Sequence, residues 1–408
     1  MRRLRLGASP WLDRATRRIR GAPPLSGEHD SDVVIVGGGI TGCATALHLA
    51  RAGLRVILFD ARQIGHGSTA ASTALLMQEP DTDFRQLSRK YGTATAREIW
   101  RLSRRAVRSL IHTIDAIPHA PHVAVRPSIY FTRRDEQVAE LRDELAARHR
   151  AGLPGRWLSP KQLAGLAGID GAGAILTSGN AQVDPYETCL AFAAAARRDG
   201  AALHERSRVR RVRSQAQGVR VETDRAKVSA RWAVIATGYA TPEFKPLAGR
   251  FRLVDTYVVA TPPLAQDVRA RLGLGPVMMW DTERPYHYAR WTADHRLLFG
   301  GHDRPHKRKT APPQVRHRTN ELLGELHGLY PAAANDLKAD YAWEGVFATT
   351  PDGLPYIGTH RRYPHHLFAL GYGGNGMTFG FLAAQIIDRL IRGKARPGDE
   401  LFRFGRRR

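Results

Sequence analysis

Three glycines near the amino end are the residues whose spacing points most directly to chemistry. Gly37, Gly39 and Gly42 follow an apolar run over residues 32–36 and precede a helical pattern, and Asp60 ends a second apolar run. Glycines in this spacing allow a tight turn, let backbone approach a pyrophosphate and let helix and strand pack closely, while the helix N-terminus stabilises phosphate charge. A carboxylate at Asp60 accepts hydrogen bonds from a ribose diol and disfavours a 2′-phosphate. We therefore predict a dinucleotide site over residues 32–60 and not an NADP site.

A second glycine cluster and one aromatic strand are weaker candidates. Gly373, Gly374 and Gly376 lead into another helical pattern, where a helix N-terminus would stabilise negative charge; a simple packing turn is the alternative. In the strand pattern of residues 285–291, Tyr286, Tyr288 and Arg290 share one face because side chains alternate along a strand. This face is a candidate wall of a substrate pocket with Arg290 as its anion anchor. The alternative is a half-buried strand with Arg290 in a salt bridge.

Composition narrows the class of protein. The chain has 408 residues, of which 43% are hydrophobic, enough for two domains with their own cores. The net charge of +24 makes nucleic-acid binding an alternative, but the basic residues are spread along the chain and no nucleic-acid-binding motif occurs. No apolar run reaches the length of a membrane span, and the basic N-terminal segment lacks a secretory signal core. The two cysteines, Cys43 and Cys189, form no metal-binding pattern. We expect a cytoplasmic protein without a metal, nucleic-acid partner or integral membrane association.

Periodic patterns divide the rest of the chain into helices and strands. Helices are expected over residues 83–117 with a break near Gly92, 135–150, 185–199 behind an Asp184 N-cap, 314–328 and 377–392. Single strands are expected over residues 123–132, 253–261, 277–282, 285–291, 296–301 and 340–348, and a meander of several short strands is expected over 203–237. This order predicts an α/β protein in which a Rossmann-like nucleotide-binding domain, assembled from discontinuous segments, carries an inserted α+β substrate domain. The expected segments are a basic arm (1–31), the nucleotide-binding domain (32–82, 180–246 and 346–393), the substrate domain (83–179 and 247–345) and a basic tail (394–408).

In this order the motifs resemble the D-amino-acid oxidase-like FAD oxidoreductases, in the glycine/sarcosine oxidase and dehydrogenase branch. The resemblance covers about residues 32–393. It rests on the glycine turn with Asp60, GSTAASTALL (67–76), Asp184-Pro185, ATG (236–238), PDGLPYIG (351–358) and GYGGNGMTFG (371–380).

The resemblance implies a role for each matching position. The first glycines would hold the FAD pyrophosphate, Asp60 the adenosine ribose, and the last helix the flavin pyrimidine end. The implied cofactor-binding residues are Gly37, Gly39, Ile40, Thr41, Gly42, Asp60, Ala61, Ser68, Thr69, Ser72, Ala74, Leu75, Val209, Ala236, Thr237, Gly238, Gly374, Asn375, Gly376, Met377 and Thr378. Among them, Ser68 and Thr69 would contact phosphate and Val209 would lie by the adenine.

The reaction implied by the resemblance is oxidation of the C–N bond of an amine or amino acid. A hydride would pass to flavin N5, the imine would hydrolyse, and oxygen or another acceptor would take the electrons. Phe347 stands where members acting on α-amino acids often place a carboxylate-binding arginine. The cysteine or histidine that relatives use to attach flavin covalently is also absent, so we expect noncovalent FAD. The alternatives are another FAD enzyme such as a desaturase or hydroxylase, an NAD-dependent dehydrogenase and, more remotely, a basic nucleic-acid-binding protein.

Overall fold

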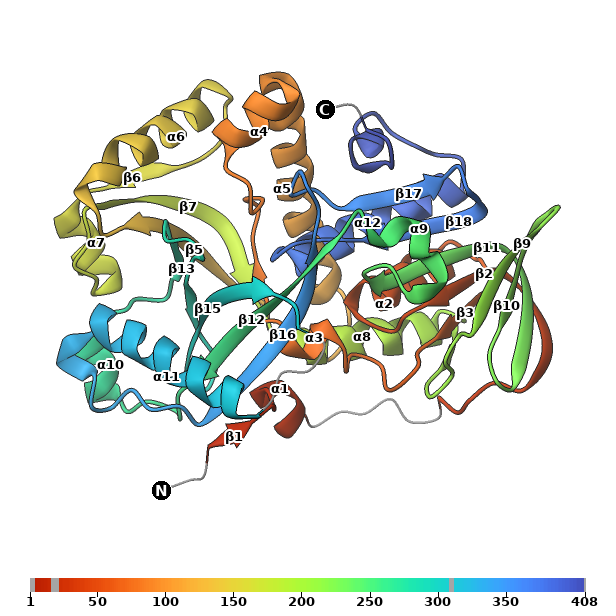
Figure 1. Ribbon diagram of the computed structural model, residues 1–408, viewed down its shortest axis with the longest axis horizontal. Coiled ribbons are helices and arrows are strands. Elements are labelled where there is room, and N and C mark those ends of the chain that lie inside the picture. The colour runs from red at the N-terminus through yellow and green to blue at the C-terminus, as the bar shows by residue number, and fades with distance from the viewer. Residues whose placement is uncertain (1–3, 16–21, 308–311, 407–408) are drawn as a thin grey trace.

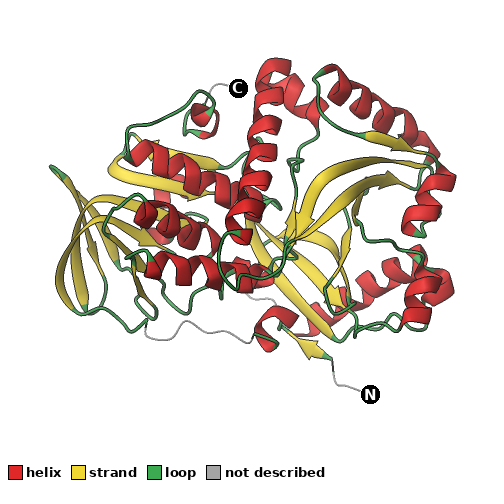
Figure 2. Cartoon of the chain, turned by 180° about the vertical axis from the view of Figure 1, so that it is seen from behind, coloured by secondary structure: helices red, strands yellow, loops and turns green. Residues whose placement is uncertain are grey.

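The chain folds around two sheets. The computed structural model describes residues 4–15, 22–307 and 312–406, and within them one sheet has eight strands and the other ten. The sheets lie beside each other, and the long helix α5 (Thr93–Asp115) runs between them (Figure 1, Figure 2). Among these residues no helix combines the length and apolar character that crossing a bilayer requires. The predicted α/β class is confirmed.

The smaller sheet has a core of parallel strands, as expected for the predicted Rossmann-like fold. Its order is β17 (Tyr356–His360), β18 (Tyr363–Leu370), β11 (Ala226–Gly238), β2 (Gly27–Val36), β3 (Val56–Phe59) and β8 (Ala202–His204), with β9 (Arg211–Gln215) and β10 (Gly218–Glu222) joined to β11. Val33 and Ile35 point to the face covered by α2 (Ile40–Arg51), α8 (Pro185–Arg198) and α12 (Gly376–Ile391). Val34 points to the other face, so β2 is buried on both sides, as a parallel strand between layers must be.

The larger sheet contains both parallel and antiparallel strand pairs. Its order is β1 (Arg5–Leu6), β16 (Tyr341–Thr349), β12 (Arg252–Ala260), β15 (Leu297–Pro305), β14 (Tyr288–Trp291), β13 (Met278–Asp281), β5 (Ala124–Thr132), β7 (Gly173–Gln182) and β4 (Leu75–Leu76), with β6 (Arg156–Leu158) paired to β7. The helices α6 (Val138–Arg150), α7 (Pro160–Ala167), α10 (Gln266–Leu272) and α11 (Pro312–Leu329) lie along its outer side (Figure 1).

Helix ends follow the capping signals in the sequence. Asp184 accepts hydrogen bonds from the backbone amides of Tyr186 at 3.0 Å and Glu187 at 2.9 Å, so α8 begins where the Asp-Pro pair predicted. The pattern over residues 83–117 divides into α4 (Phe84–Tyr91) and α5, because Gly92 has a φ of 80° that interrupts the helix.

The described residues of both terminal segments pack against the rest of the fold, where the sequence suggested a basic arm over 1–31 and a basic tail over 394–408. At the amino end, β1 pairs in parallel with β16, and Trp11 in the short helix α1 (Pro10–Asp13) is only 6% exposed. At the carboxyl end, Phe402 is buried and Arg406 pairs with Asp352. Basic composition suggested solvated ends, but the apolar side chains between the charges find core positions. The segment boundaries shift too, since β2 begins at residue 27 and β16 extends to residue 349.

Candidate functional site

The first glycine turn is held by contacts that leave no space for side chains. Gly37 has a φ of 110°, and a Cβ there would lie 2.6 Å from the carbonyl oxygen of Ala236. A Cβ on Gly42 would lie 1.8 Å from the carbonyl oxygen of Gly37. The turn therefore brings β2, α2 and β11 together at backbone distance, with the N-terminus of α2 facing the space above it. This is the cradle that a pyrophosphate group requires.

Asp60 is fixed at the end of β3 beside this turn. Its Oδ2 accepts a hydrogen bond from the Gly38 amide at 2.8 Å, and its Oδ1 accepts one from the Arg62 amide at 2.7 Å. Each carboxylate oxygen has a further lone pair, so Asp60 can still accept the hydroxyls of a ribose.

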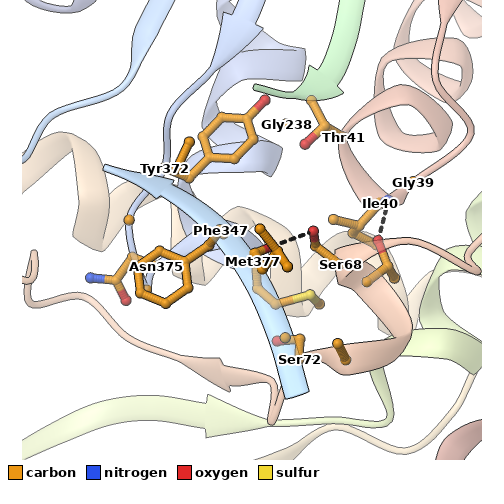
Figure 3. A pocket seen from close by; sticks show the side chains of 18 of the residues that line it. Gly39, Ile40, Thr41, Ser68, Ser72, Gly238, Phe347, Tyr372, Asn375 and Met377 are labelled. Carbon is orange, nitrogen blue, oxygen red and sulfur yellow. Dashed lines mark hydrogen bonds between the residues drawn. The ribbon is translucent and has the colours of Figure 1, made fainter. Parts of the chain in front are cut away.

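A single large cavity joins the glycine turn to the N-terminus of α12. Its volume is about 800 Å³, and it passes between the two sheets. Every predicted cofactor residue except Gly42 and Thr378 lines it, and Figure 3 shows Thr41, Ser68, Phe347, Tyr372 and Met377 converging on it. Gly42 packs beneath the turn instead. The buried hydroxyl of Thr378, the residue after Met377, donates to the carbonyl oxygen of Met77 at 2.9 Å.

The predicted phosphate-contacting hydroxyls have partners within the protein. Ser68 Oγ donates to the carbonyl oxygen of Val346 at 2.7 Å, and Thr69 Oγ1 accepts the amide of Ile40 at 3.0 Å (Figure 3). Both residues line the cavity, and their hydrogen bonds tie the helix α3 (Ser68–Ala71) to β16 and α2. Their role in this structure is to hold α3 against the cavity.

Three consecutive carbonyl groups, beginning with the last residue of α3, accept hydrogen bonds from three different elements. The indole of Trp343 in β16 donates to Ala71 at 2.9 Å, and the indole of Trp11 in the N-terminal segment donates to Ser72 at 2.9 Å. The guanidinium of Arg290 donates to Thr73. Residues 71–75 all line the cavity. We call them the flavin loop, because Ala74 and Leu75 are among the predicted cofactor-binding residues.

Arg290 is therefore not the substrate anchor that the strand pattern suggested. Its side chain is 3% exposed and does not line the cavity. Its Nη2 donates to the carbonyl oxygen of Val183 at 2.8 Å, and its guanidinium lies 5.2 Å from the ring of Trp11. Burial lowers its pKa to about 10, so it stays cationic at neutral pH. It orders backbone instead of binding substrate.

The carboxyl-terminal glycine cluster closes the other end of the cavity. Asn375 Nδ2 donates to the carbonyl oxygen of Glu79 at 2.8 Å, and the amide of Gly374 donates to Asp81 at 2.5 Å. The first turn of α12 then directs its amides toward the cavity beside Met377. The positive end of this helix favours a negatively charged group there.

Next to this end lies a polar group that contains the two predicted tyrosines. Tyr286 and Tyr288 line the cavity with their rings 5.9 Å apart, and the Tyr288 hydroxyl lies 3.2 Å from Thr256 Oγ1. Burial raises the pKa of Asp81 to about 6 and that of Asp303 to about 6. Oδ1 of Asp303 is enclosed and has no hydrogen-bond partner among the described residues. We call Asp81, Thr256, Tyr286, Tyr288 and Asp303 the amine-end cluster.

Nine residues that line the cavity near the two tyrosines were not predicted from the sequence. They are Glu79, Asp81, Asp83, Gln86, Tyr130, Arg148, Trp280, Arg284 and Asp303. The acidic run over residues 79–83, directly after the predicted flavin contacts, was a usable signal. Arg148 had none, because it lies in a helix as rich in charge as any surface helix.

The geometry fits a flavin dinucleotide. The cavity has a backbone cradle and a ribose acceptor at one end and a helix N-terminus at the other, as a long ligand with a diphosphate and an electron-accepting ring requires. A family model described as FAD dependent oxidoreductase (DAO) matches residues 32–390. The chain belongs to this family. The FAD of this family is the cofactor that the cavity fits.

Similar proteins cover nearly the whole chain. Gamma-glutamylputrescine oxidoreductase of Escherichia coli K12 is 28% identical over 386 residues, which are 90% of this chain and 85% of that protein. Glycine oxidase of Bacillus licheniformis is 26% identical over 89% of this chain and 93% of that protein. Among solved structures, glycine oxidase from Geobacillus kaustophilus has a TM-score of 0.78 at 23% identity, covering 93% of this chain and 99% of that one. The last likeness supports the fold.

Proposed function

We propose that this FAD-dependent oxidoreductase oxidises the C–N bond of an amine whose reacting end is a cation without an adjacent carboxylate. The observation that carries the proposal is the amine-end cluster, which places Asp81 and Asp303 beside the N-terminus of α12. The unpartnered Oδ1 of Asp303 is an acceptor suited to an ammonium group. An α-carboxylate on the reacting carbon would meet these two acids, and Phe347 offers it no counter-charge.

The residues of the chain bind and orient the amine, and FAD, when bound, supplies the two-electron acceptor. The Tyr286 and Tyr288 rings form an apolar wall with hydroxyls at its edge, and the acids hold the protonated amine before reaction. Enclosure between the two sheets excludes water from the reacting carbon. Because Asp303 has a pKa of about 6, it is ionised at neutral pH and takes up a proton as the pH falls through 6.

The comparisons support an amine in preference to the other flavin reactions. The printed names of the relatives include an oxidoreductase of gamma-glutamylputrescine and several glycine oxidases, all of which act on C–N bonds. No described feature favours a desaturase, a hydroxylase or a nucleic-acid-binding role. We also propose noncovalent FAD, because no cysteine or histidine is found among the described residues that line the cavity. We further propose a reducing, cytoplasmic location, supported by two buried free thiols, Cys43 and Cys189, whose Sγ atoms lie 3.6 Å apart.

Anaerobic reduction of the bound flavin tests the proposal. Linear amines should bleach its absorbance, and α-amino acids with the same side chain should do so at least tenfold less efficiently. Asp303→Asn should raise the amine concentration for half-maximal reduction about tenfold or more. It should also lessen the loss of amine binding as the pH falls through about 6, and the part that remains belongs to Asp81, whose pKa is also about 6. The matched control is Asp267→Asn on the exposed side of α10. Reduction by NADH alone, or faster reduction by α-amino acids, would contradict the proposal.

A further inference from the structure

A buried arginine at the far end of the cavity has donors without acceptors. Arg148 in α6 is 2% exposed, yet it lines the cavity. Its Nε donates to Glu144 Oε1 at 2.8 Å, and its guanidinium lies 4.6 Å from the ring of Trp100. Nη1 is enclosed without a hydrogen-bond partner, and neither Nη atom has one within the described part of the chain. A buried guanidinium with two unused nitrogens is costly unless a ligand pairs with it.

Glu144 does not satisfy this cation fully. Its Oε1 also accepts the amide of Phe84 at 2.8 Å, and its Oε2 accepts the amide of Arg85 at 3.0 Å. The carboxylate therefore serves as the acceptor at the N-terminus of α4, whose dipole shares its charge. Arg148 is left with one hydrogen bond through Nε, and its guanidinium lines the cavity with two nitrogens that have no acceptor among the described residues. A guanidinium is the side-chain group that binds a carboxylate most strongly.

Neighbouring residues complete an anion-binding end with a polar rim. Arg284 lines the same region, with Nη2 3.5 Å from the Tyr130 hydroxyl and 3.9 Å from Asp83. The charges of Arg148 and Arg284 both lower the pKa of Asp83, while burial and then the charge of Glu144 raise it, to a net value of about 6. The two arginines and this acid thus act on one another across a shared space. We call Asp83, Tyr130, Arg148 and Arg284 the distal cluster.

An aromatic row connects the distal cluster to the amine-end cluster. Trp280 in β13 is the register partner of Tyr130 in β5 on one side and of Tyr288 in β14 on the other. The Tyr130 and Trp280 rings stack with centroids 5.3 Å apart, and all three side chains line the cavity. Neighbouring strands are about 4.8 Å apart, so the row spans two strand spacings, about 10 Å. Such a wall suits an extended aliphatic chain.

We propose that the substrate carries a carboxylate at the end remote from the oxidised amine, and that Arg148 binds it. This rests on the proposed function and names its substrate class as a long ω-amino acid. Three covalent bonds span about 3.8 Å in an extended chain, so a separation near 10 Å corresponds to roughly eight bonds between nitrogen and carboxyl carbon. Arg284 stands at the rim, where it draws the acid inward.

The test compares 8-aminooctanoate with its primary amide, which has the same length and no charge. In the unaltered holoenzyme the acid should have a kcat/KM about 10- to 100-fold higher than the amide, through KM and not kcat. Arg148→Gln should abolish that preference, and Arg148→Lys should retain part of it. The matched control is Arg142→Gln, because Arg142 lies on the same helix and covers Trp157 at 4.2 Å in the way that Arg148 covers Trp100.

Calorimetric binding to the oxidised holoenzyme keeps this proposal separate from the proposed function. If no amine reduces the flavin, the proposed function fails; tighter binding of the acid than of the amide that depends on Arg148 still supports the distal site. Equal binding of acid and amide by the unaltered protein overturns the proposal even where the variants do not fold. An equal loss of acid and amide binding in Arg148→Gln also overturns it, because that result shows Arg148 to be structural. 4-Aminobutanoate, too short for both clusters, should gain nothing from Arg148.

Discussion

Replacing Trp11 by phenylalanine should weaken FAD binding although Trp11 does not line the cavity. The indole Nε1 donates to the Ser72 carbonyl at 2.9 Å, and phenylalanine keeps the ring beside Arg290 but has no donor. Losing this bond and leaving a buried carbonyl without a partner costs about 1–2 kcal/mol. Since the carbonyl belongs to the flavin loop, we expect this lost free energy to appear as weaker binding of FAD. The Kd for FAD should rise about 5- to 30-fold.

Titration of apoprotein with FAD, followed by quenching of flavin fluorescence, measures this change. Trp291→Phe is the matched control, because the Trp291 indole donates to the Leu274 carbonyl at 3.2 Å, away from the cavity. Trp343→Phe, which frees the Ala71 carbonyl, should behave like Trp11→Phe. If Trp11→Phe and Trp291→Phe change the Kd equally, or if Trp11→Phe lowers only the Tm of the apoprotein, the inference that these donors hold the flavin loop is refuted.

Two further predictions concern the turn and the chain end. Gly42→Ala should abolish FAD binding, measured by flavin content after purification, since its Cβ would lie 1.8 Å from the Gly37 carbonyl oxygen, which is backbone and cannot move aside. Arg406→Met should lower the free energy of unfolding at pH 7 by about 3–5 kcal/mol, because it leaves the buried carboxylate of Asp352 unpaired. Burial raises the pKa of Asp352, but hydrogen bonds and charge from Arg406 outweigh burial and place that pKa well below its usual value. The stabilisation is therefore present above about pH 4 and lost as the pH falls further, so urea unfolding should show the two proteins converging in acid.

Matched variants serve as controls for the predictions on Gly42 and Arg406. Gly165→Ala in α7 has nothing within 4 Å of the added Cβ and should keep full flavin content. Arg403→Met removes an exposed charge from the same C-terminal segment and should leave stability nearly unchanged. Flavin retained by Gly42→Ala, or equal losses in Arg406→Met and Arg403→Met, would contradict the contacts assigned to Gly42 and Arg406.

The nucleotide end of the site was predictable because its causes are local. A turn that admits no Cβ at Gly37 or Gly42 must be glycine in the sequence, and a carboxylate at the end of the next strand must be an acid. Asp184 likewise marks its own helix start. The contact at Gly42 and the cap at Asp184 involve residues close in sequence, and Asp60 belongs to the same strand–helix–strand unit as Gly38, so spacing alone predicts them. The contact at Gly37 is with distant Ala236, but the glycine that it requires is part of the same motif.

The substrate end was poorly predicted because distant segments decide its contacts. The alternation of side chains along the strand correctly predicted that Tyr286 and Tyr288 line a pocket. It could not show that Arg290 donates hydrogen bonds to the carbonyl groups of Thr73 and Val183, which lie more than a hundred residues away in the sequence. Arg148 could not be predicted for the same reason. It is buried and Arg150 is exposed because Arg148 lies on the side of α6 where Glu144 contacts the start of α4. The sequence pattern around a charged residue shows that the charge is there, but it does not show which distant group the residue contacts.

The flavin loop connects the N-terminal segment with elements of both halves of the fold. Its carbonyls are fixed by an indole from the N-terminal segment, an indole from β16 and a guanidinium from β14, while Thr69 just before it ties to the first turn of α2. The nucleotide cradle belongs to the small sheet, yet the residues that position the adjoining loop belong to the large one. Tyr288, a substrate contact under the proposed function, lies two residues from Arg290 on the same strand. Under that proposal, β14 links the wall that binds the amine to the loop beside the cofactor.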